Sequence, residues 1–326
     1  MFTLLDNPDP LGVLSSTLPV VEQAGSVRIE LTGVDLLAKR IANHEFSPPE
    51  WESGLHWRGE PEETANFILL LDALNFCFWG EPRWMVTFEG QHYNGYWALA
   101  AALTRSMRQG IPLTDAEYLA QISEPDLASV LSGDGMIPLL PERVANLREV
   151  GRVLVDSYQG QFAHLIADCN SSAIDLVRRV VAEFPSFNDV AIFGGREVRF
   201  YKRAQILASD LAGAFDGKGL GRFHDLNQLT AFADYKVPQV LQQLGVLHYD
   251  VTLTNILQQQ EEITPGHAYE LEIRSATLWS VEALRQALDR LGLRIPPYQL
   301  DWMLWQLGQD LSADVLPYHR TRTIYY

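Results

Sequence analysis

The sequence predicts a mainly α-helical protein with a small amount of β structure. Apolar residues recur at helical spacing through most of the chain, as in residues 64–78, 96–107, 141–166, 171–184 and 280–291. Start and stop signals bracket several of these segments, and only two short stretches have an extended pattern. The length of 326 residues fits one large domain over residues 1–326, with room for two closely packed helical lobes.

The predicted helix ends carry residues that satisfy unpaired backbone groups. Thr114-Asp115 and Ser123 stand where short helices begin, and their side-chain oxygens can accept hydrogen bonds from the first backbone N–H groups. Gly110, Gly133 and Gly245 stand where helices are expected to stop, since glycine adopts the left-handed conformation that ends many helices.

The two extended stretches are residues 84–93 and 269–273. The first alternates around Glu89-Gly90, which predicts a β-hairpin with its turn at that dipeptide. The second, Tyr-Glu-Leu-Glu-Ile, alternates strictly between polar and apolar residues. This alternation predicts a short strand.

Composition is typical of a globular cytoplasmic protein, with 47% hydrophobic and 20% charged residues. Cys77 and Cys169 are too few for a disulfide framework, so we expect two reduced, buried thiols. No secretion leader is recognisable at the start of the sequence. The longest apolar stretch, residues 67–79, is interrupted by Asp72 and Asn75 and is too short to span a membrane.

The charge balance disfavours nucleic acid as a partner. The chain has 25 Lys and Arg against 41 Asp and Glu, a formal charge of −16. Such a surface repels a phosphate backbone, so we expect no binding to intact DNA or RNA. A small phosphorylated ligand held in a local basic pocket remains compatible with this charge.

Familiar catalytic and cofactor motifs are absent from the sequence. It contains no G-x-x-x-x-G-K-[ST], G-x-G-x-x-G, H-E-x-x-H, C-x-x-C or G-x-S-x-G pattern. The eight histidines are scattered rather than clustered. We therefore predict that the protein uses neither a metal ion nor a cofactor.

Three stretches allow both a structural and a functional interpretation. In residues 72–79, periodicity favours a core helix, but Asp72 and Asn75 are polar residues on one helical face and need partners, of which a ligand is one. Residues 199–205 and 232–239 form either a solvated basic helix start and a turn before a helix, or a phosphate-binding group near a catalytic carboxylate.

The third stretch is the C-terminal region. Trp302 and Trp305 lie three residues apart and form an aromatic face, which is more often core than a base-stacking surface. The closing Ile-Tyr-Tyr of residues 324–326 is expected to be packed rather than frayed, because these side chains gain from burial.

Taken together, these stretches resemble the queuosine salvage protein family. The sequence blocks that carry the resemblance are LDALNFCFW (71–79), HYNGYW (92–97), EFPSFNDV (183–190), FYKRAQIL (200–207), FADYKVPQVLQQLG (232–245), LEIRS (271–275) with the TLWSVE that follows it, and YHRTRTIYY (318–326). The resemblance covers nearly the whole chain. It implies a helical fold related to DNA glycosylases and hydrolysis of the N-glycosidic bond of queuosine 5'-phosphate to queuine and ribose 5-phosphate.

The resemblance also implies roles for individual residues. Asp234 matches the catalytic carboxylate, and Lys202 matches the family's lysine, which is similar to the lysine of the Lys/Asp pairing in some base-excision glycosylases. The implied base-binding positions are His56, Phe232, Asp301 and Trp302. Family members often carry an acidic residue five positions after Asp301; this chain has Gln306 there, which keeps the position as a binding candidate without a carboxylate role.

The chemistry of this reaction adds further candidates. Queuine is a 7-deazaguanine whose leaving nitrogen lacks help from a protonatable N7, so a carboxylate beside the developing oxocarbenium ion is needed. Trp279 is a further aromatic side chain suited to stacking on the base, Asn75 a further polar contact, and Arg199, Arg203 and Arg322 are basic groups suited to the 5'-phosphate.

Two alternatives stay open at this point. One is a non-catalytic protein that binds queuine or a related nucleoside, and the other is a nucleosidase for ordinary purine nucleotides. In each case the expected partner is a small molecule, with no membrane involved, and the chain is expected to act as a monomer in the cytoplasm. The favoured reaction would feed queuine back into tRNA modification.

Overall fold

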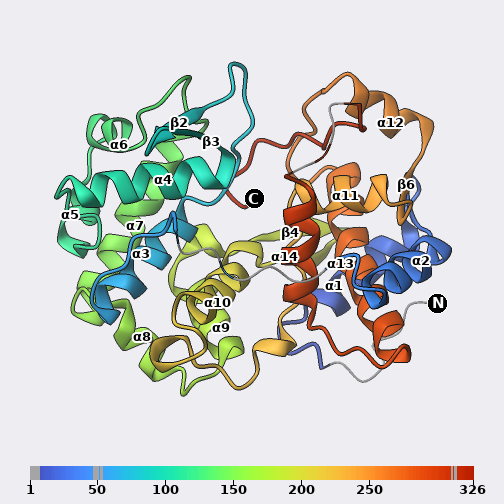
Figure 1. Cartoon of the computed structure of the whole chain (residues 1–326), viewed down its shortest axis with the longest axis horizontal. Helices are drawn as coiled ribbons and strands as arrows, with labels where there is room; N and C mark the ends of the chain where they lie inside the picture. Colours follow the sequence, from blue (N-terminus) through green and yellow to red (C-terminus); the bar gives the residue numbers. More distant parts are fainter. Residues whose placement is uncertain (1–7, 47–50, 52–53, 310, 312–313) are drawn as a thin grey trace. The chain divides into compact units, whose positions relative to one another are not determined.

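The computed structural model describes residues 8–46, 51, 54–309, 311 and 314–326. The fold is mainly helical, with three short antiparallel strand pairs among the described residues. The chain divides into two compact units (Figure 1). The first unit comprises Met1–Pro49, Asp189–Lys202 and Asn227–Arg322, and the second comprises Glu50–Asn188, Arg203–Leu226 and Thr323–Tyr326.

The first unit is built around the long helix α13. Its helices are α1 (Val13–Gln23), α2 (Leu31–Ala42), α11 (Lys236–Gln243), α12 (Val251–Gln258), α13 (Ala268–Arg290) and α14 (Pro297–Leu307). Its strand pairs are β1 (Val27–Ile29) with β6 (Leu247–Tyr249), and β4 (Val190–Phe193) with β5 (Arg196–Arg199). Helix α13 contacts α1, α2, α11 and α14, so it forms the centre of this unit's core (Figure 1).

In the second unit, helices α3 and α7 each contact several of the other helices. Its helices are α3 (Pro61–Ala73), α4 (Gly95–Arg108), α5 (Ala116–Gln121), α6 (Glu124–Val130), α7 (Leu140–Tyr158), α8 (Phe162–Asp168) and α9 (Ala173–Glu183), with most of α10 (Lys202–Ala214) and short 3-10 turns at Pro185–Phe187 and Gly219–Gly221. A third turn, Leu226–Gln228, lies at the boundary of the two units. Residues of α3 from Thr64 to Ala73 are all buried, which makes α3 the core helix of this unit.

Several expectations from the sequence are confirmed. Asp115 and Ser123 cap α5 and α6 by accepting hydrogen bonds from backbone N–H groups of their first turns. The predicted hairpin is present as β2 (Met85–Phe88) and β3 (Gln91–Asn94), with Glu89 and Gly90 at positive φ in its turn. Both cysteines are buried thiols outside any disulfide.

The last residues are packed as expected. Tyr326 is buried in the second unit, where its carbonyl accepts a hydrogen bond of 2.9 Å from the backbone N–H of Cys77. Within the described part of the chain, no helix combines the length and apolarity needed to cross a membrane.

The strand predicted at residues 269–273 is wrong, because this segment is the first part of helix α13. The alternation arose because its polar residues are buried with partners instead of facing solvent. Glu272 accepts hydrogen bonds from the backbone N–H groups of Ser26 and Val27, and Glu270 lies 3.6 Å from the guanidinium of Arg274 one turn later. The alternation of polar and apolar residues in this segment therefore does not mark the two faces of a β-strand.

The single helix predicted over residues 141–166 is also wrong in part, since it is broken into α7 and α8. Gln159 and Gly160 both adopt positive φ, and the N–H of Gly160 donates to the carbonyl of Leu154. The buried side chain of Asn66 fixes this break by donating to the Gly160 carbonyl and accepting from the N–H of Phe162. The sequence carried the signal in Gly160, a residue that favours helix ends.

Candidate active site

Asp234 lies in the first unit, immediately before helix α11. Its side chain is 8% exposed, and its Oδ1 accepts hydrogen bonds of 2.8 Å from the backbone N–H groups of both Lys236 and Val237. These donors orient the carboxylate at the positive end of the α11 dipole. No described residue donates a hydrogen bond to the other oxygen, Oδ2. One oxygen thus holds the side chain in place while the other is available for chemistry.

Lys202 follows strand β5 in the same unit and is 5% exposed. Its backbone N–H donates to Oδ2 of Asp189 at 3.3 Å. Burial raises the pKa of both Asp234 and Asp301, and the positive charge of the Lys202 ammonium group opposes that rise. Lys202 and Asp234 are 32 residues apart in the sequence, but the fold brings them near enough for their charges to interact.

Asp301 lies on α14 and is 4% exposed. Its Oδ1 accepts a hydrogen bond of 2.8 Å from the backbone N–H of Phe232, two residues before Asp234. This contact ties α14 to the segment that carries Asp234. The buried Phe232 thus takes part in the site through its backbone N–H.

The two carboxylates differ in their electrostatic environment. Burial raises the pKa of Asp234 above its ordinary value, while Lys202 and the two amide donors act in the opposite direction. Burial and then the charge of Asp234 raise the pKa of Asp301 well above its ordinary value. Asp234 is therefore the group more easily ionised, and Asp301 the one more easily protonated, a division that acid–base sites commonly use.

A buried ion pair supports the segments around Lys202 and Asp234. Both amino groups of the Arg274 guanidinium donate to the carboxylate of Asp189, at 3.0 and 2.6 Å, and its Nε donates to the carbonyl of Ala233 at 3.0 Å. Both partners are 2% exposed in their side chains. The guanidinium also lies over the ring of Phe200, with 3.8 Å between its central carbon and the ring centroid.

A second polar cluster occurs in the second unit and contains two predicted residues, His56 and Asn75. His56 Nε2 lies 2.8 Å from the hydroxyl of Tyr96, and Tyr96 is also hydrogen-bonded to Asp210. Asn75 Nδ2 donates to Oδ1 of the fully buried Asp72 at 3.3 Å. Burial, followed by the charges of Asp210 and Asp72, raises the pKa of Tyr96 well above its usual range.

This cluster fixes the geometry of its histidine. Because the Tyr96 hydroxyl donates to Asp210, it accepts from His56, so His56 carries a proton on Nε2. The imidazole also stacks on the ring of Trp51, with 4.2 Å between centroids. Two kinds of contact therefore hold the ring in one orientation.

The basic candidates have different environments. Arg203 is buried, and its guanidinium donates to the backbone carbonyls of Asp72, Ala73 and Ser186, which favours a structural role. Arg199 forms an ion pair with Glu197 on its own strand at 2.8 Å.

The C-terminal basic groups also differ from one another. Arg322 is exposed and forms an ion pair of 2.8 Å with Glu262. Burial, with the charge of Arg274, lowers the pKa of His319 to about 3, so this imidazole is neutral at physiological pH. Of these two residues, Arg322 is therefore the one that carries a charge and is exposed to solvent.

The aromatic candidates in the C-terminal region also differ in how far they are exposed to solvent. Trp279 is 1% exposed and its Nε1 donates to the hydroxyl of Thr17 at 3.1 Å, an environment that favours packing of α13 against α1. Trp302 is partly exposed on α14 and lies edge-on to Tyr298. Gln306, one turn further along α14, is exposed.

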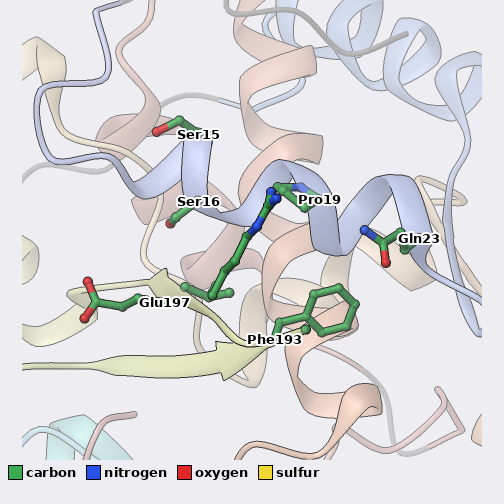
Figure 2. Close-up of a pocket in the computed structure, with 9 residues that line it drawn as sticks. Ser15, Ser16, Pro19, Gln23, Phe193 and Glu197 are labelled. Carbon is green, nitrogen blue, oxygen red and sulfur yellow. The ribbon is translucent and has the colours of Figure 1, made fainter.

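Another feature of the first unit is a pocket of about 340 Å³ between α1 and the β4–β5 hairpin. Figure 2 shows Ser15, Ser16, Pro19 and Gln23 of α1 facing Phe193 and Glu197 of the hairpin. None of the residues predicted from the sequence lines it. Among the residues that the structure describes, no three His, Cys, Asp or Glu side chains gather as ligands for a metal ion.

Sequence reasoning missed Asp189, Arg274, Tyr96 and Asp210. The sequence carries a signal for Arg274 in its place within the LEIRS block (271–275) that carries the family resemblance. The strand expected over residues 269–273 hides it, because these residues and Arg274 belong to one helix, α13. The partners Asp189 and Asp210 carry no local signal, since their roles depend on contacts with residues far away in the sequence.

The fold and site define a mainly helical protein with a buried group of two aspartates and a lysine whose charges interact. Residues 55–326 match the family described as "Queuosine salvage protein". The chain belongs to the queuosine salvage protein family.

Three relatives show how far this similarity extends, each of them named "Queuosine 5'-phosphate N-glycosylase/hydrolase". The protein from Sphaerobacter thermophilus is 54% identical over 99% of this chain and 100% of its own length. The protein from Mus musculus is 36% identical over 97% of this chain and 99% of its own. The protein from Schizosaccharomyces pombe is 36% identical over 85% of this chain and 87% of its own.

Proposed function

We propose that the protein hydrolyses the N-glycosidic bond of queuosine 5'-phosphate and releases queuine and ribose 5-phosphate. The observation that carries the proposal is the group formed by Asp234, Lys202 and Asp301, buried together in one unit and coupled through their charges. The activity in the names of the relatives supports the same reaction. The product queuine would then be available for tRNA modification.

Asp234 is proposed as the catalytic carboxylate. As the glycosidic bond lengthens, positive charge develops on the ribose, and a fixed carboxylate nearby stabilises it. The Oδ2 atom is suited to this role because Oδ1 is held by the two N–H groups at the start of α11. The same oxygen is suited to accept a proton from the attacking water.

Lys202 is proposed to keep Asp234 ionised in a buried environment. Burial raises the pKa of Asp234, and the ammonium group acts against that rise. Without the lysine, a larger fraction of Asp234 would be protonated and unable to act as a base. The proposed role of Lys202 is thus electrostatic.

The base and the phosphate are proposed to contact other predicted residues. Asp301 is suited to the donor groups of the guanine-like edge or to the cationic side arm of queuine, because a carboxylate accepts hydrogen bonds from both. His56 and Trp302 are proposed as further base contacts, and Arg322 as a phosphate contact. The chain supplies each of these groups itself, so we propose that it acts as a monomer. The absence of a disulfide between its two described cysteines supports a cytoplasmic location.

The proposal is tested by incubating the purified protein with queuosine 5'-phosphate and following free queuine and ribose 5-phosphate by chromatography. Hydrolysis with multiple turnovers is expected. Tight binding of queuine without release of base from the nucleotide would instead identify a binding protein. Comparable turnover of guanosine 5'-phosphate in the same assay would identify a general purine nucleosidase.

A further inference from the structure

Two segments of the first unit carry the residues proposed for catalysis. Lys202 follows the β4–β5 hairpin as the first residue of α10, and Asp234 lies in an irregular stretch before α11. The first N–H groups of a helix have no partner within that helix, and an irregular stretch has no regular hydrogen bonds of its own, so contacts outside these segments define where both residues lie. The contacts that do so here converge on Asp189 and Arg274.

Asp189 closes the hairpin at the end where Lys202 leaves it. Its carbonyl oxygen accepts hydrogen bonds from the N–H groups of Phe200 and Tyr201, at 3.0 and 3.2 Å. Its Oδ2 accepts from the N–H of Lys202 at 3.3 Å. Three successive backbone amides are thus held by one residue, and the last of them is that of Lys202.

Arg274 joins this hairpin end to the segment of Asp234. Its Nη1 and Nη2 donate to the Asp189 carboxylate at 3.0 and 2.6 Å, while its Nε donates to the carbonyl of Ala233, the residue before Asp234, at 3.0 Å. The guanidinium is planar and rigid, so these three bonds fix the relative position of the two backbones. Its own position is set by helix α13 and by the ring of Phe200 beneath it.

We propose that Arg274 and Asp189 are positioning residues for the reaction, holding Lys202 and Asp234 at the separation that catalysis needs. This inference rests on the proposed function. It adds two residues that do not touch the reacting atoms but act through the backbones of two that do. A displacement of about 1 Å in a catalytic group is enough to reduce a rate by roughly 100-fold.

The direct test is Arg274→Lys in the full-length protein. A lysine keeps the positive charge but cannot donate at once to both Asp189 oxygens and to the Ala233 carbonyl in a fixed plane. We expect kcat to fall about 10- to 100-fold, with KM changed less than about threefold, at a temperature well below the Tm of the variant. Arg285→Lys is the matched control, since Arg285 lies on the same helix and forms a two-bond ion pair with Glu282 at the other end of α13.

Asp189→Asn tests the other half of the pair and remains informative if Arg274→Lys fails to fold. We expect the same pattern, a kcat loss with little change in KM. Arg274→Ala should recover part of its activity when guanidinium ion is added at millimolar concentration, a rescue that a role in stability alone does not predict. A folded Arg274→Lys or Asp189→Asn variant with more than one third of the wild-type kcat would overturn the proposal. So would the failure of both variants to fold, which would assign the pair to stability.

The wild-type assay separates this inference from the proposed function. Absence of queuine release by the wild-type protein contradicts the function. Normal wild-type turnover combined with full activity in both folded variants contradicts only the positioning role.

Discussion

The exchange of Asp234 for asparagine is the sharpest test of the site, because the structure assigns different tasks to the two oxygens of this side chain. Oδ1 accepts the hydrogen bonds of Lys236 and Val237 at 2.8 Å and so caps helix α11. An asparagine carbonyl can accept the same two bonds, so the cap should survive. The change removes the negative charge and places an amide where Oδ2 had been.

The expected effect on stability is small and follows from the direction of the pKa shift. The pKa of Asp234 is raised in the folded protein, so the ionised group destabilises the fold relative to a neutral one. The stability that the neutral acid contributes is complete below the unfolded pKa and is lost as the pH rises through the folded pKa. At neutral pH, Asp234→Asn should therefore leave Tm unchanged or raise it slightly.

The expected effect on catalysis is large. Removing one electrostatic or general-base group typically reduces kcat by about 10²–10³-fold, which corresponds to roughly 2.7–4.1 kcal/mol of transition-state stabilisation. Single-turnover assays with queuosine 5'-phosphate measure this loss, thermal melts check folding, and calorimetry checks that queuine still binds. If Asp234 only caps α11, the variant should fold normally and turn over at nearly the wild-type rate.

Asp250→Asn is the matched control for this experiment. Asp250 caps α12 in the same unit, where its Oδ1 accepts a hydrogen bond of 2.7 Å from the N–H of Leu253, and it has no proposed part in the reaction. It should keep wild-type kcat. A well-folded Asp234→Asn protein that retains more than about a tenth of wild-type kcat, a barrier change below roughly 1.4 kcal/mol, would refute the catalytic assignment.

Four further predictions use the same assay. Turnover should survive prolonged treatment with EDTA, and loss of activity that a divalent ion restores would contradict metal independence. The nucleotide should exceed the nucleoside in kcat/KM, and Arg322→Gln should shrink that ratio if this arginine contacts the phosphate; equal efficiency on both substrates would count against a phosphate site. Asp301→Ala should weaken queuine binding by about 2–5 kcal/mol in calorimetry, whereas unchanged affinity would indicate a structural carboxylate. The midpoint of the acidic limb in a plot of kcat/KM against pH should lie above 3.8, the ordinary pKa of an aspartate. The reason is that the carboxylate form of Asp234 is lost as the pH falls through its raised pKa. A midpoint at or below 3.8 would contradict the assignment.

Local features of the fold were predictable from the sequence, and long-range ones were not. Helix caps such as Asp115 and Ser123 depend on a few neighbouring residues, so the sequence indicates them directly. The break at Gly160 depends also on the side chain of Asn66, almost a hundred residues earlier in the chain. The segment 269–273 was misassigned because burial of polar residues depends on partners that periodicity does not reveal.

The candidate site shows the same limit. Nothing in the spacing of Lys202, Asp234 and Asp301 indicates that their charges interact, and only the family resemblance selected them from the acidic and basic residues of the chain. The structure adds that they lie in one unit and that Asp301 is tied to the Asp234 segment through the N–H of Phe232. It also adds Arg274, whose role depends on hydrogen bonds to segments 41 and 85 residues away.

The coupling of the two aspartates has a consequence for ligand selection. Burial and the charge of Asp234 favour the neutral form of Asp301, so a cationic ligand group that pairs with Asp301 as a carboxylate draws off a proton as it binds. On the proposed function, the cationic arm of queuine favours loss of this proton more than a neutral group at the same position does, because only the cation gains from the negative charge. The free energy needed to remove that proton decreases as the pH rises toward the pKa of Asp301. Discrimination between a cationic and a neutral base would therefore come from the ionisation of Asp301 itself, and it requires the Asp234 charge to remain in place beside it.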